Sequence, residues 1–91
     1  MSEFISIDLK RSAIVLAEES NFAKAAEKLK MPVAELAEQI STLESQLYCR
    51  LFKPTSENVE LTEEGKFLIK AFRESVALHD RNVHESPNED Q

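Results

Sequence analysis

The chain has 91 residues, a hydrophobic fraction of 42% and a formal net charge of −6, which suits one small globular domain. A negative net charge is unusual in a dedicated nucleic-acid binder, because displaced counterions supply much of such a protein's affinity. One cysteine excludes an internal disulfide bond, and no apolar run is long enough to span a bilayer. No segment has the form of a signal peptide, so these features predict a cytoplasmic protein.

The first third of the chain predicts two helices. Apolar residues at helical spacing predict a first helix over Ile7–Glu19, with Ser6 as its N-cap. A short second helix is predicted over Phe22–Leu29. Its inner face contains Ala25 and Ala26, whose small side chains allow another helix to cross closely.

A third helix is predicted over Pro32–Leu47, with Pro32 in its first position. Its apolar stripe recurs at spacings of three and four residues and consists of Val33, Leu36, Ile40, Leu43 and Leu47. The stripe places one face in a core and leaves the opposite face free. Two helices joined by a tight corner at residues 30–31, the second with a free face, predict a helix-turn-helix that can enter a DNA groove.

The second half of the chain predicts a short hairpin and a long helix. The strands are expected at Leu51–Phe52 and Val59–Leu61, and such a hairpin beside a helix-turn-helix is called a wing. Thr62 is the expected N-cap of a last helix that runs to about Arg81. Gly65 lies inside that helix, where glycine costs about 1 kcal/mol against alanine, so close packing over it is expected.

The last helix carries two apolar stripes. The stripe expected to face the domain consists of Leu61, Gly65, Leu68, Phe72 and Val76. The second consists of Phe67, Ala71 and Leu78 and is either a dimer seam or part of a broad core face with some exposed apolar residues. The predicted organisation is therefore a domain over residues 1–61, a linker helix over 62–81 and a disordered tail over 82–91.

Several motifs lie between Leu9 and Ala77, a stretch over which the chain resembles a known family without insertions or deletions. They are Phe22-Ala23-Lys24-Ala25-Ala26-Glu27-Lys28-Leu29, Gln39-Ile40, Leu43-Glu44, Leu47, Leu51-Phe52 and Leu61-Thr62-Glu63-Glu64-Gly65. In this combination they resemble the N-terminal winged helix-turn-helix domain of LysR-type transcriptional regulators. The resemblance implies a mainly α fold of three helices, a two-stranded wing and a C-terminal linker helix for dimerisation. It also implies regulation of transcription from a DNA site with two half-sites.

The chain departs from that family in its length. Family members usually continue into a larger effector-binding domain, whereas this chain stops after the linker helix. We therefore expect a stand-alone headpiece with no small-molecule effector site, no cofactor and no membrane association.

A second departure concerns the positions that face DNA in the family. The reading helix typically starts with a Ser-Gln-Pro-Ala-x-Ser-Arg run, which is replaced here by Pro32-Val33-Ala34-Glu35-Leu36-Ala37-Glu38. In the wing, residues that are usually arginine are replaced by Pro54, Glu57 and Glu60. Most of the expected hydrogen-bond donors to DNA are therefore missing.

The residues that remain still define a predicted DNA-binding surface. Lys24 and Thr55 match the family motif and can contact phosphate. Three basic neighbours extend the surface without matching the motif: Lys28, Lys30 and Lys53. The start of the reading helix adds Val33, Ala34, Glu35 and Glu38. Glutamate accepts a hydrogen bond from cytosine, but only where nearby cations hold the phosphates.

Two functions remain open at this point. The first is a DNA-binding transcription regulator that dimerises through its last helix. The second is a framework that has lost sequence-specific DNA binding and acts through protein contacts, for example with a related regulator or a basic partner. The acidic third helix favours the second hypothesis, since Glu35, Glu38 and Glu44 are accompanied by no lysine or arginine.

An enzyme is not expected. His79 and His84 are five residues apart, which is not the spacing that places two metal ligands on one helix face. Cys49 has no histidine near it in the chain, and a single glycine cannot form a phosphate-binding loop.

Overall fold

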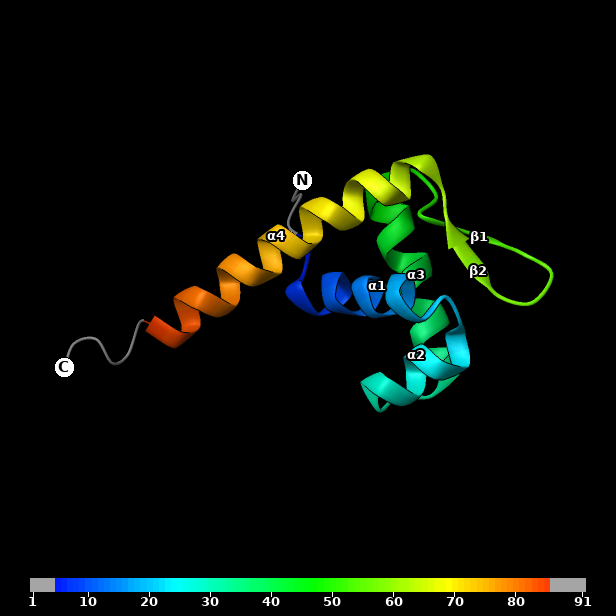
Figure 1. The fold of residues 1–91 in the computed structure, drawn as a ribbon, viewed down its shortest axis with the longest axis horizontal. Helices are drawn as coiled ribbons and strands as arrows, with labels where there is room; N and C mark the ends of the chain where they lie inside the picture. The colour runs from blue at the N-terminus through cyan, green and yellow to red at the C-terminus, as the bar shows by residue number, and fades with distance from the viewer. Residues whose placement is uncertain (1–4, 86–91) are drawn as a thin grey trace.

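The computed structural model describes residues 5–85 as a group of helices with a hairpin (Figure 1). The elements in chain order are α1 (Ile7–Glu19), α2 (Phe22–Leu29), α3 (Val33–Leu47), β1 (Phe52–Pro54), β2 (Val59–Leu61) and α4 (Glu63–Glu85). The hairpin and the far end of α4 project to opposite sides of the body. This is the winged helix-turn-helix architecture with a C-terminal helix that the sequence predicts.

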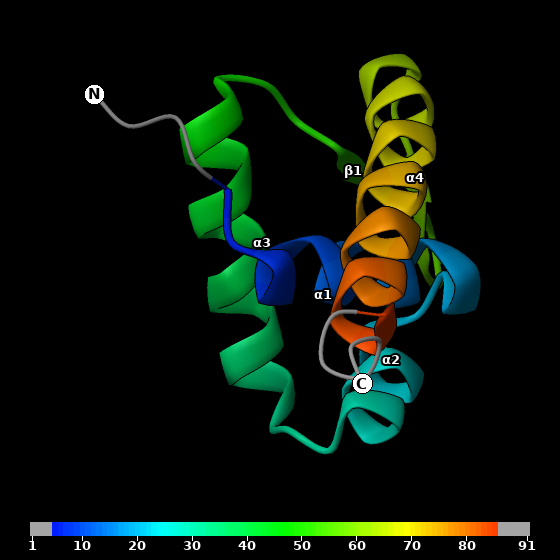
Figure 2. The ribbon, with the colours of Figure 1, turned by 90° about the vertical axis from the view of Figure 1, so that its left-hand side faces the viewer.

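Helix α1 lies at the centre of the molecule, between α3 and α4 (Figure 2). Ser6 caps it by accepting a hydrogen bond from the backbone N–H of Leu9, as predicted. On its buried side, the hydroxyl of Ser12 donates to Oε1 of Gln39 on α3 over 2.6 Å. This bond satisfies a buried polar group and fixes how α1 crosses α3.

All four helices and β1 contribute to one core. Its buried apolar residues are Ala13, Leu16, Ala25, Ala26, Leu36, Ile40, Leu43, Leu51, Phe52, Ile69 and Phe72. Both predicted small residues of α2 are among them, so the close approach expected from their size is confirmed. The predicted inner stripe of α3 is confirmed at its three central positions.

The corner between α2 and α3 differs in one detail from the prediction. Lys30 adopts a left-handed backbone conformation with φ 61°, which ends α2 and turns the chain. Pro32 has extended backbone angles and is the N-cap of α3, so α3 begins at Val33 and not at Pro32. Val33 is 46% exposed, and its assignment to the core stripe was therefore wrong. It lies too close to the helix start for the core to cover it.

The wing is an antiparallel ribbon in which Phe52 pairs with Leu61 and Pro54 with Val59. Its first strand begins one residue later than predicted and extends to Pro54, which an edge strand tolerates although proline has no N–H to donate. The N–H of Val59 donates to the carbonyl of Ser20 over 3.1 Å. This bond ties the wing to the α1–α2 junction.

Helix α4 begins as predicted, with the hydroxyl of Thr62 accepting from the N–H of Gly65 over 2.9 Å. A Cβ atom at Gly65 would overlap the carbonyl oxygen of Leu51, so close packing explains the helical glycine. The helix continues to Glu85, and the prediction that its end lies near Arg81 was wrong. The rest of the predicted tail, residues 86–91, lies outside the described residues.

Polar contacts fix α4 along α1. Nη2 of Arg11 lies 2.5 Å from Oδ1 of Asp80, and Nη2 of Arg73 lies 3.8 Å from a carboxylate oxygen of Glu18. The hydrogen bond with Asp80 raises the pKa of Arg11 above its ordinary value. Among the helices of residues 5–85, none is long and apolar enough to cross a membrane.

Candidate nucleic-acid interface

Helix α3 has an inner and an outer face of different chemistry. The inner face is buried through Leu36, Ile40 and Leu43. The outer face is exposed and consists of Ala34, Glu35, Ala37, Glu38, Ser41, Thr42 and Ser45. Glu35 and Glu38 therefore project away from the core, and neither forms an ion pair within residues 5–85. The sequence alone did not decide this orientation.

An open groove lies between the outer face of α3 and the wing. Its α3 wall includes Ser41 and Ser45, and its wing wall includes Lys53 and Pro54. Tyr48, which is 93% exposed, lies at the end where the helix meets the connection to β1. The helix and the wing thus border one concave surface. Among the predicted DNA-binding residues, all of which the structure describes, Lys53 alone lines this groove, and the predicted residues at the start of α3 lie outside it.

Lysine and arginine side chains near this surface are mostly paired with carboxylates. The pairs join Lys28 Nζ to Glu19 at 3.1 Å, Arg50 Nε to Glu44 at 3.2 Å and Lys53 Nζ to Glu60 at 3.6 Å. The hydrogen bond with Glu19 raises the pKa of Lys28. Lys24 and Lys30 form no ion pair with any residue in the described part of the chain, and both are exposed.

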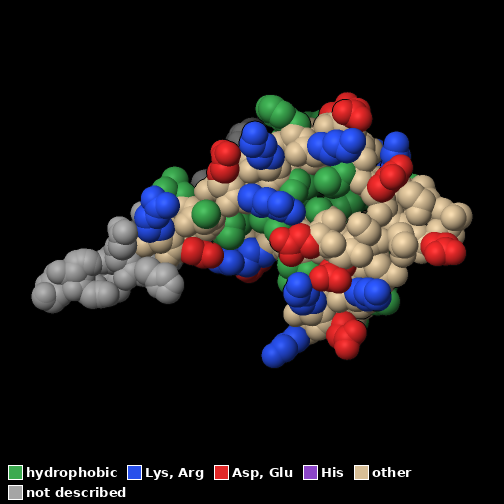
Figure 3. Space-filling model, viewed as in Figure 1, with side chains coloured by type: hydrophobic (Ala, Val, Ile, Leu, Met, Phe, Trp, Pro, Cys, Tyr) green, Lys and Arg blue, Asp and Glu red, His purple; other side chains and the backbone are tan. Residues whose placement is uncertain are grey.

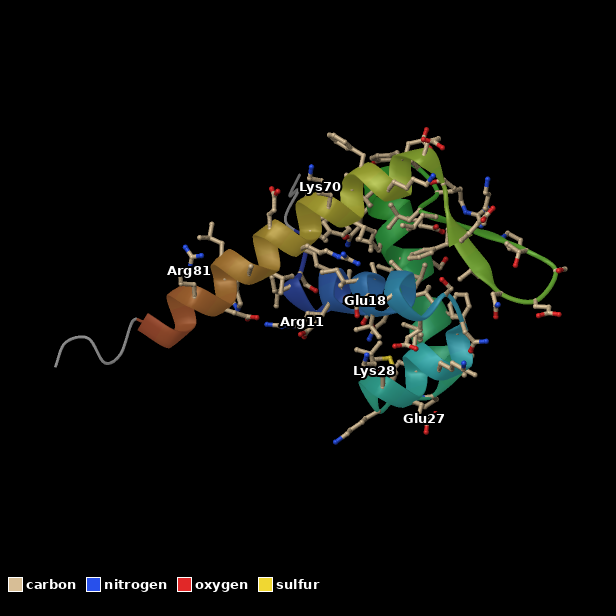
Figure 4. All side chains as sticks on the ribbon, viewed as in Figure 1. Arg11, Glu18, Glu27, Lys28, Lys70 and Arg81 are labelled. Carbon is tan, nitrogen blue, oxygen red and sulfur yellow. The ribbon has the colours of Figure 1, made fainter. Side chains whose placement is uncertain are left out.

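Charges of both signs are mixed on the face of the molecule that the space-filling view shows. In Figure 3, cationic and anionic side chains are interspersed over α1, α2 and α4. In Figure 4, Lys28 lies on the side of α2 that faces α1, whereas Glu27 points away from the body. The predicted DNA-binding lysines therefore differ: Lys28 and Lys53 have carboxylate partners, whereas Lys24 and Lys30 have none among the described residues.

Glu44 has a structural role that the sequence did not reveal. Its side chain is 14% exposed, and its Oε2 atom accepts from the backbone N–H groups of Leu51 and Phe52 at 2.7 and 3.1 Å. Its Oε1 atom contacts Arg50. Counting Glu44 as a surface anion of the reading helix was therefore wrong, because it holds the start of the wing. The only sequence feature that could have indicated this structural role is the presence of Glu44 in the Leu43-Glu44 motif.

Thr55 supports the tip of the wing. Its hydroxyl accepts from the N–H of Asn58 over 2.9 Å, while its own N–H donates to the carbonyl of Asn58 over 2.8 Å. From the start of α2, Nδ2 of Asn21 donates to Oδ1 of Asn58 over 2.9 Å. Thr55 is exposed, although both its hydroxyl and its backbone N–H take part in holding the turn.

The three residues predicted for a dimer seam share one exposed side of α4. Phe67 is 74% exposed and Leu78 is 54% exposed, and Ala71 lies between them and is also exposed. Lys70 and Arg81 lie on the side of α4 that is turned away from α1 (Figure 4). Their exposure is compatible with both predictions, a dimer seam or apolar residues left exposed beside a broad core face.

Residues 8–66 match the family described as bacterial regulatory helix-turn-helix protein, lysR family. The chain belongs to this family. The matched segment contains α2, α3, the wing and the Gly65 contact, so it includes the outer face of α3 and the groove, whereas the exposed residues Phe67, Ala71 and Leu78 of α4 lie beyond it.

Curated relatives align with most of this chain but with a small part of their own length. The HTH-type transcriptional regulator YbhD of Escherichia coli K12 is 33% identical over 73 residues, which are 80% of this chain and 23% of that protein. The HTH-type transcriptional regulator ShiR of Corynebacterium glutamicum strain R is 41% identical over 64 residues, which are 70% of this chain and 22% of that protein. The chain thus spans about a quarter of the length of these relatives.

Solved structures have the same architecture. The BenM_DBD/catB site 1 DNA complex superimposes with a TM-score of 0.86 at 29% identity and covers 90% of this chain and 88% of that chain. The CbnR_DBD–DNA complex has a TM-score of 0.90 at 24% identity and covers 96% of this chain and 100% of that chain. The likeness to CbnR bears on the fold alone.

Residues 5–85 contain no group of three or more histidine, cysteine, aspartate or glutamate side chains arranged to hold a metal ion. His79 is exposed on α4, and Cys49 is a half-buried free thiol beside the groove. The relatives reported above are named as transcriptional regulators.

Proposed function

We propose that this protein regulates transcription by binding double-stranded DNA with α3, the α2–α3 corner and the wing. The free outer face of α3, which opens beside the wing onto one groove, is the observation that carries the proposal. A helix with one free face beside a wing is suited to the major groove of DNA. BenM_DBD, which is 29% identical to this chain, has the same architecture in its complex with catB DNA.

The proposal assigns different tasks to the exposed residues. Lys24 and Lys30 contact phosphates, because they have no carboxylate partner among the described residues. Lys28 and Lys53 contribute less, since a phosphate must first displace Glu19 or Glu60. Thr55 contacts the phosphate backbone of the DNA from the wing. The first turns of α3 face the bases through Val33, Ala34, Glu35 and Glu38.

Fluorescence anisotropy with labelled genomic DNA fragments at several salt concentrations tests this proposal. With two unpaired lysines in each protomer, a dimer should show a slope of log K against log [salt] of roughly −4. The double variant Lys24→Glu, Lys30→Glu should lose most of the affinity. Lys66→Glu, which makes a single charge reversal on α4 away from the α2–α3 corner, serves as the control and should have a much smaller effect.

The opposite outcome has a clear meaning. If the wild-type protein binds no fragment at low salt, or binds with an affinity that salt does not change, the DNA-binding proposal is wrong. A function through protein contacts would then take its place. Because bacterial DNA lies in the cytoplasm, the DNA-binding proposal also implies a cytoplasmic location.

We further propose that two copies of the chain pair along α4. Exposed residues recur on one side of the helix at spacings of four, three and four: Phe67, Ala71, Glu74 and Leu78. An antiparallel pair would bring Phe67 against the partner's Leu78 and Lys70 near the partner's Glu74. Either direction would bury both apolar side chains, and the pairing of opposite charges supports the antiparallel register over a parallel one.

Sedimentation equilibrium tests the pairing. The wild-type protein should sediment as a dimer, whereas Phe67→Glu and Leu78→Glu should each shift it toward the monomer, because a buried carboxylate would have no partner. Ala23→Glu adds the same charge at an exposed site on α2 and should leave the mass unchanged. A monomeric wild-type protein, or a dimer in both α4 variants, would contradict the proposed seam.

A further inference from the structure

We propose that the first turns of α3 read pyrimidines, with Glu35 and Glu38 accepting hydrogen bonds from cytosine and the apolar side chains around them contacting thymine methyl groups. The inference rests on the DNA-binding function proposed above. It goes beyond that function because it assigns the base preference to individual residues that depart from the family pattern.

Apart from the hydroxyls of Ser41, Thr42 and Ser45, which do not distinguish one base from another, the outer face of α3 offers few ways to contact a base edge. Guanine is usually read by arginine or lysine and adenine by asparagine or glutamine. Residues 33–47 contain no arginine or lysine, so the usual partner of guanine is missing. They contain two glutamines, of which Gln39 accepts the hydroxyl of Ser12 and lies toward α1, while Gln46 lies at the far end of the helix.

The carboxylates of Glu35 and Glu38 are the strong acceptors that remain. Both are exposed, and neither forms an ion pair with any residue within 5–85. The amino group on C4 of cytosine is the only base donor in the major groove that a G·C pair presents, and glutamate accepts from it. Three residues of a helix rise about 4.5 Å, which is close to one base-pair step of about 3.4 Å. The two carboxylates can therefore reach adjacent base pairs.

Small apolar side chains surround the two glutamates. They are Val33, Ala34 and Ala37, all of which are exposed at the same end of α3. The methyl group of thymine is the apolar feature of the major groove, and small apolar side chains contact it. Carboxylates that approach phosphates need compensating charge, and the unpaired lysines Lys24, in the first turn of α2, and Lys30, at the α2–α3 corner, can provide it.

Selection of binding duplexes from a random pool by the full chain tests the inference. The wild-type protein should enrich sites with adjacent cytosines flanked by thymine in each half-site. Glu35→Gln and Glu38→Gln should each move the preference at one position from cytosine toward adenine, with a change in discrimination of roughly 5- to 150-fold. Replacing the flanking thymines by deoxyuridine should weaken wild-type binding, because only the methyl group is removed.

Glu64→Gln is the matched control, since it removes the same charge from an exposed position on α4. It should raise the affinity for all sequences alike and leave the selected motif unchanged. If the protein selects duplexes but neither α3 variant changes the motif, the inference is wrong and the DNA-binding function remains. If no duplex is retained at low salt, the proposed DNA-binding function fails and the inference fails with it.

Discussion

The two faces of α3 differ: the inner face is apolar and buried, and the outer face is exposed and carries glutamates. Leu36 and Leu43 on the inner face are fully buried and contribute to the one core of the molecule. Glu35 and Glu38 on the outer face are exposed, and neither forms an ion pair with another described residue. The resemblance to the lysR family implies that the inner face retains the family motif, while the outer face departs from it. The fold can therefore be kept while the surface that meets a ligand changes.

Substitutions on the inner face of α3 should cause the largest loss of stability. Leu43→Ala removes a fully buried side chain and should lower the free energy of unfolding by about 2–5 kcal/mol. The adjacent outer residue gives a matched control, since Thr42→Ala should change the free energy by no more than about 0.5 kcal/mol. Urea denaturation followed by circular dichroism measures both. Equal effects at the two positions would contradict the division.

An intermediate effect should separate two glutamates of the same helix. Glu44→Gln weakens the bonds to the N–H groups of Leu51 and Phe52 and removes the ion pair with Arg50. It should cost about 1–3 kcal/mol of stability, because buried groups lose a charged partner. Glu38→Gln should cost less than about 0.5 kcal/mol. Thermal and urea unfolding of the two variants compare them directly, and a larger loss at Glu38 would reverse the assignment of roles.

A substitution at the start of α3 should cause the smallest loss of stability and shows where the inner face ends. Val33 is 46% exposed, so Val33→Ala should lower the free energy of unfolding by about 0.5 kcal/mol or less. Leu36→Ala, three residues later and fully buried, should cost several times more. Should Val33→Ala cost as much as Leu36→Ala in urea denaturation, the core would extend to the first turn of α3.

The sequence predicted those features of the fold that depend on local chemistry or on helical spacing. The caps at Ser6 and Thr62 and the close packing at Gly65 are confirmed. Each of these features follows from one residue: a hydroxyl that accepts a hydrogen bond from a backbone N–H at a helix start, or a glycine that leaves room for a neighbouring carbonyl group. The end of α4 was predicted too early, because the polar residues after Arg81 resemble a tail although the helix continues.

Features that depend on tertiary contacts were harder to predict. The role of Glu44 follows from the N–H groups of Leu51 and Phe52, which come close only after the chain has turned at the end of α3. The pairing of Lys28 with Glu19 likewise requires α1 and α2 to be in place. Composition gave the number of charges near the candidate interface but did not show which of them are already paired.

The most direct test of the central claim is to map the DNA contact by NMR. Amide signals of ¹⁵N-labelled protein are followed while a selected duplex is added, and the duplex is then exchanged for a scrambled one. We expect the largest shifts along the outer face of α3 from Ala34 to Thr42, at Lys24 and Lys30, and at Thr55, with smaller shifts for the scrambled duplex. Shifts confined to the exposed side of α4, or no shifts with either duplex, would contradict the claim that the outer face of α3 reads DNA.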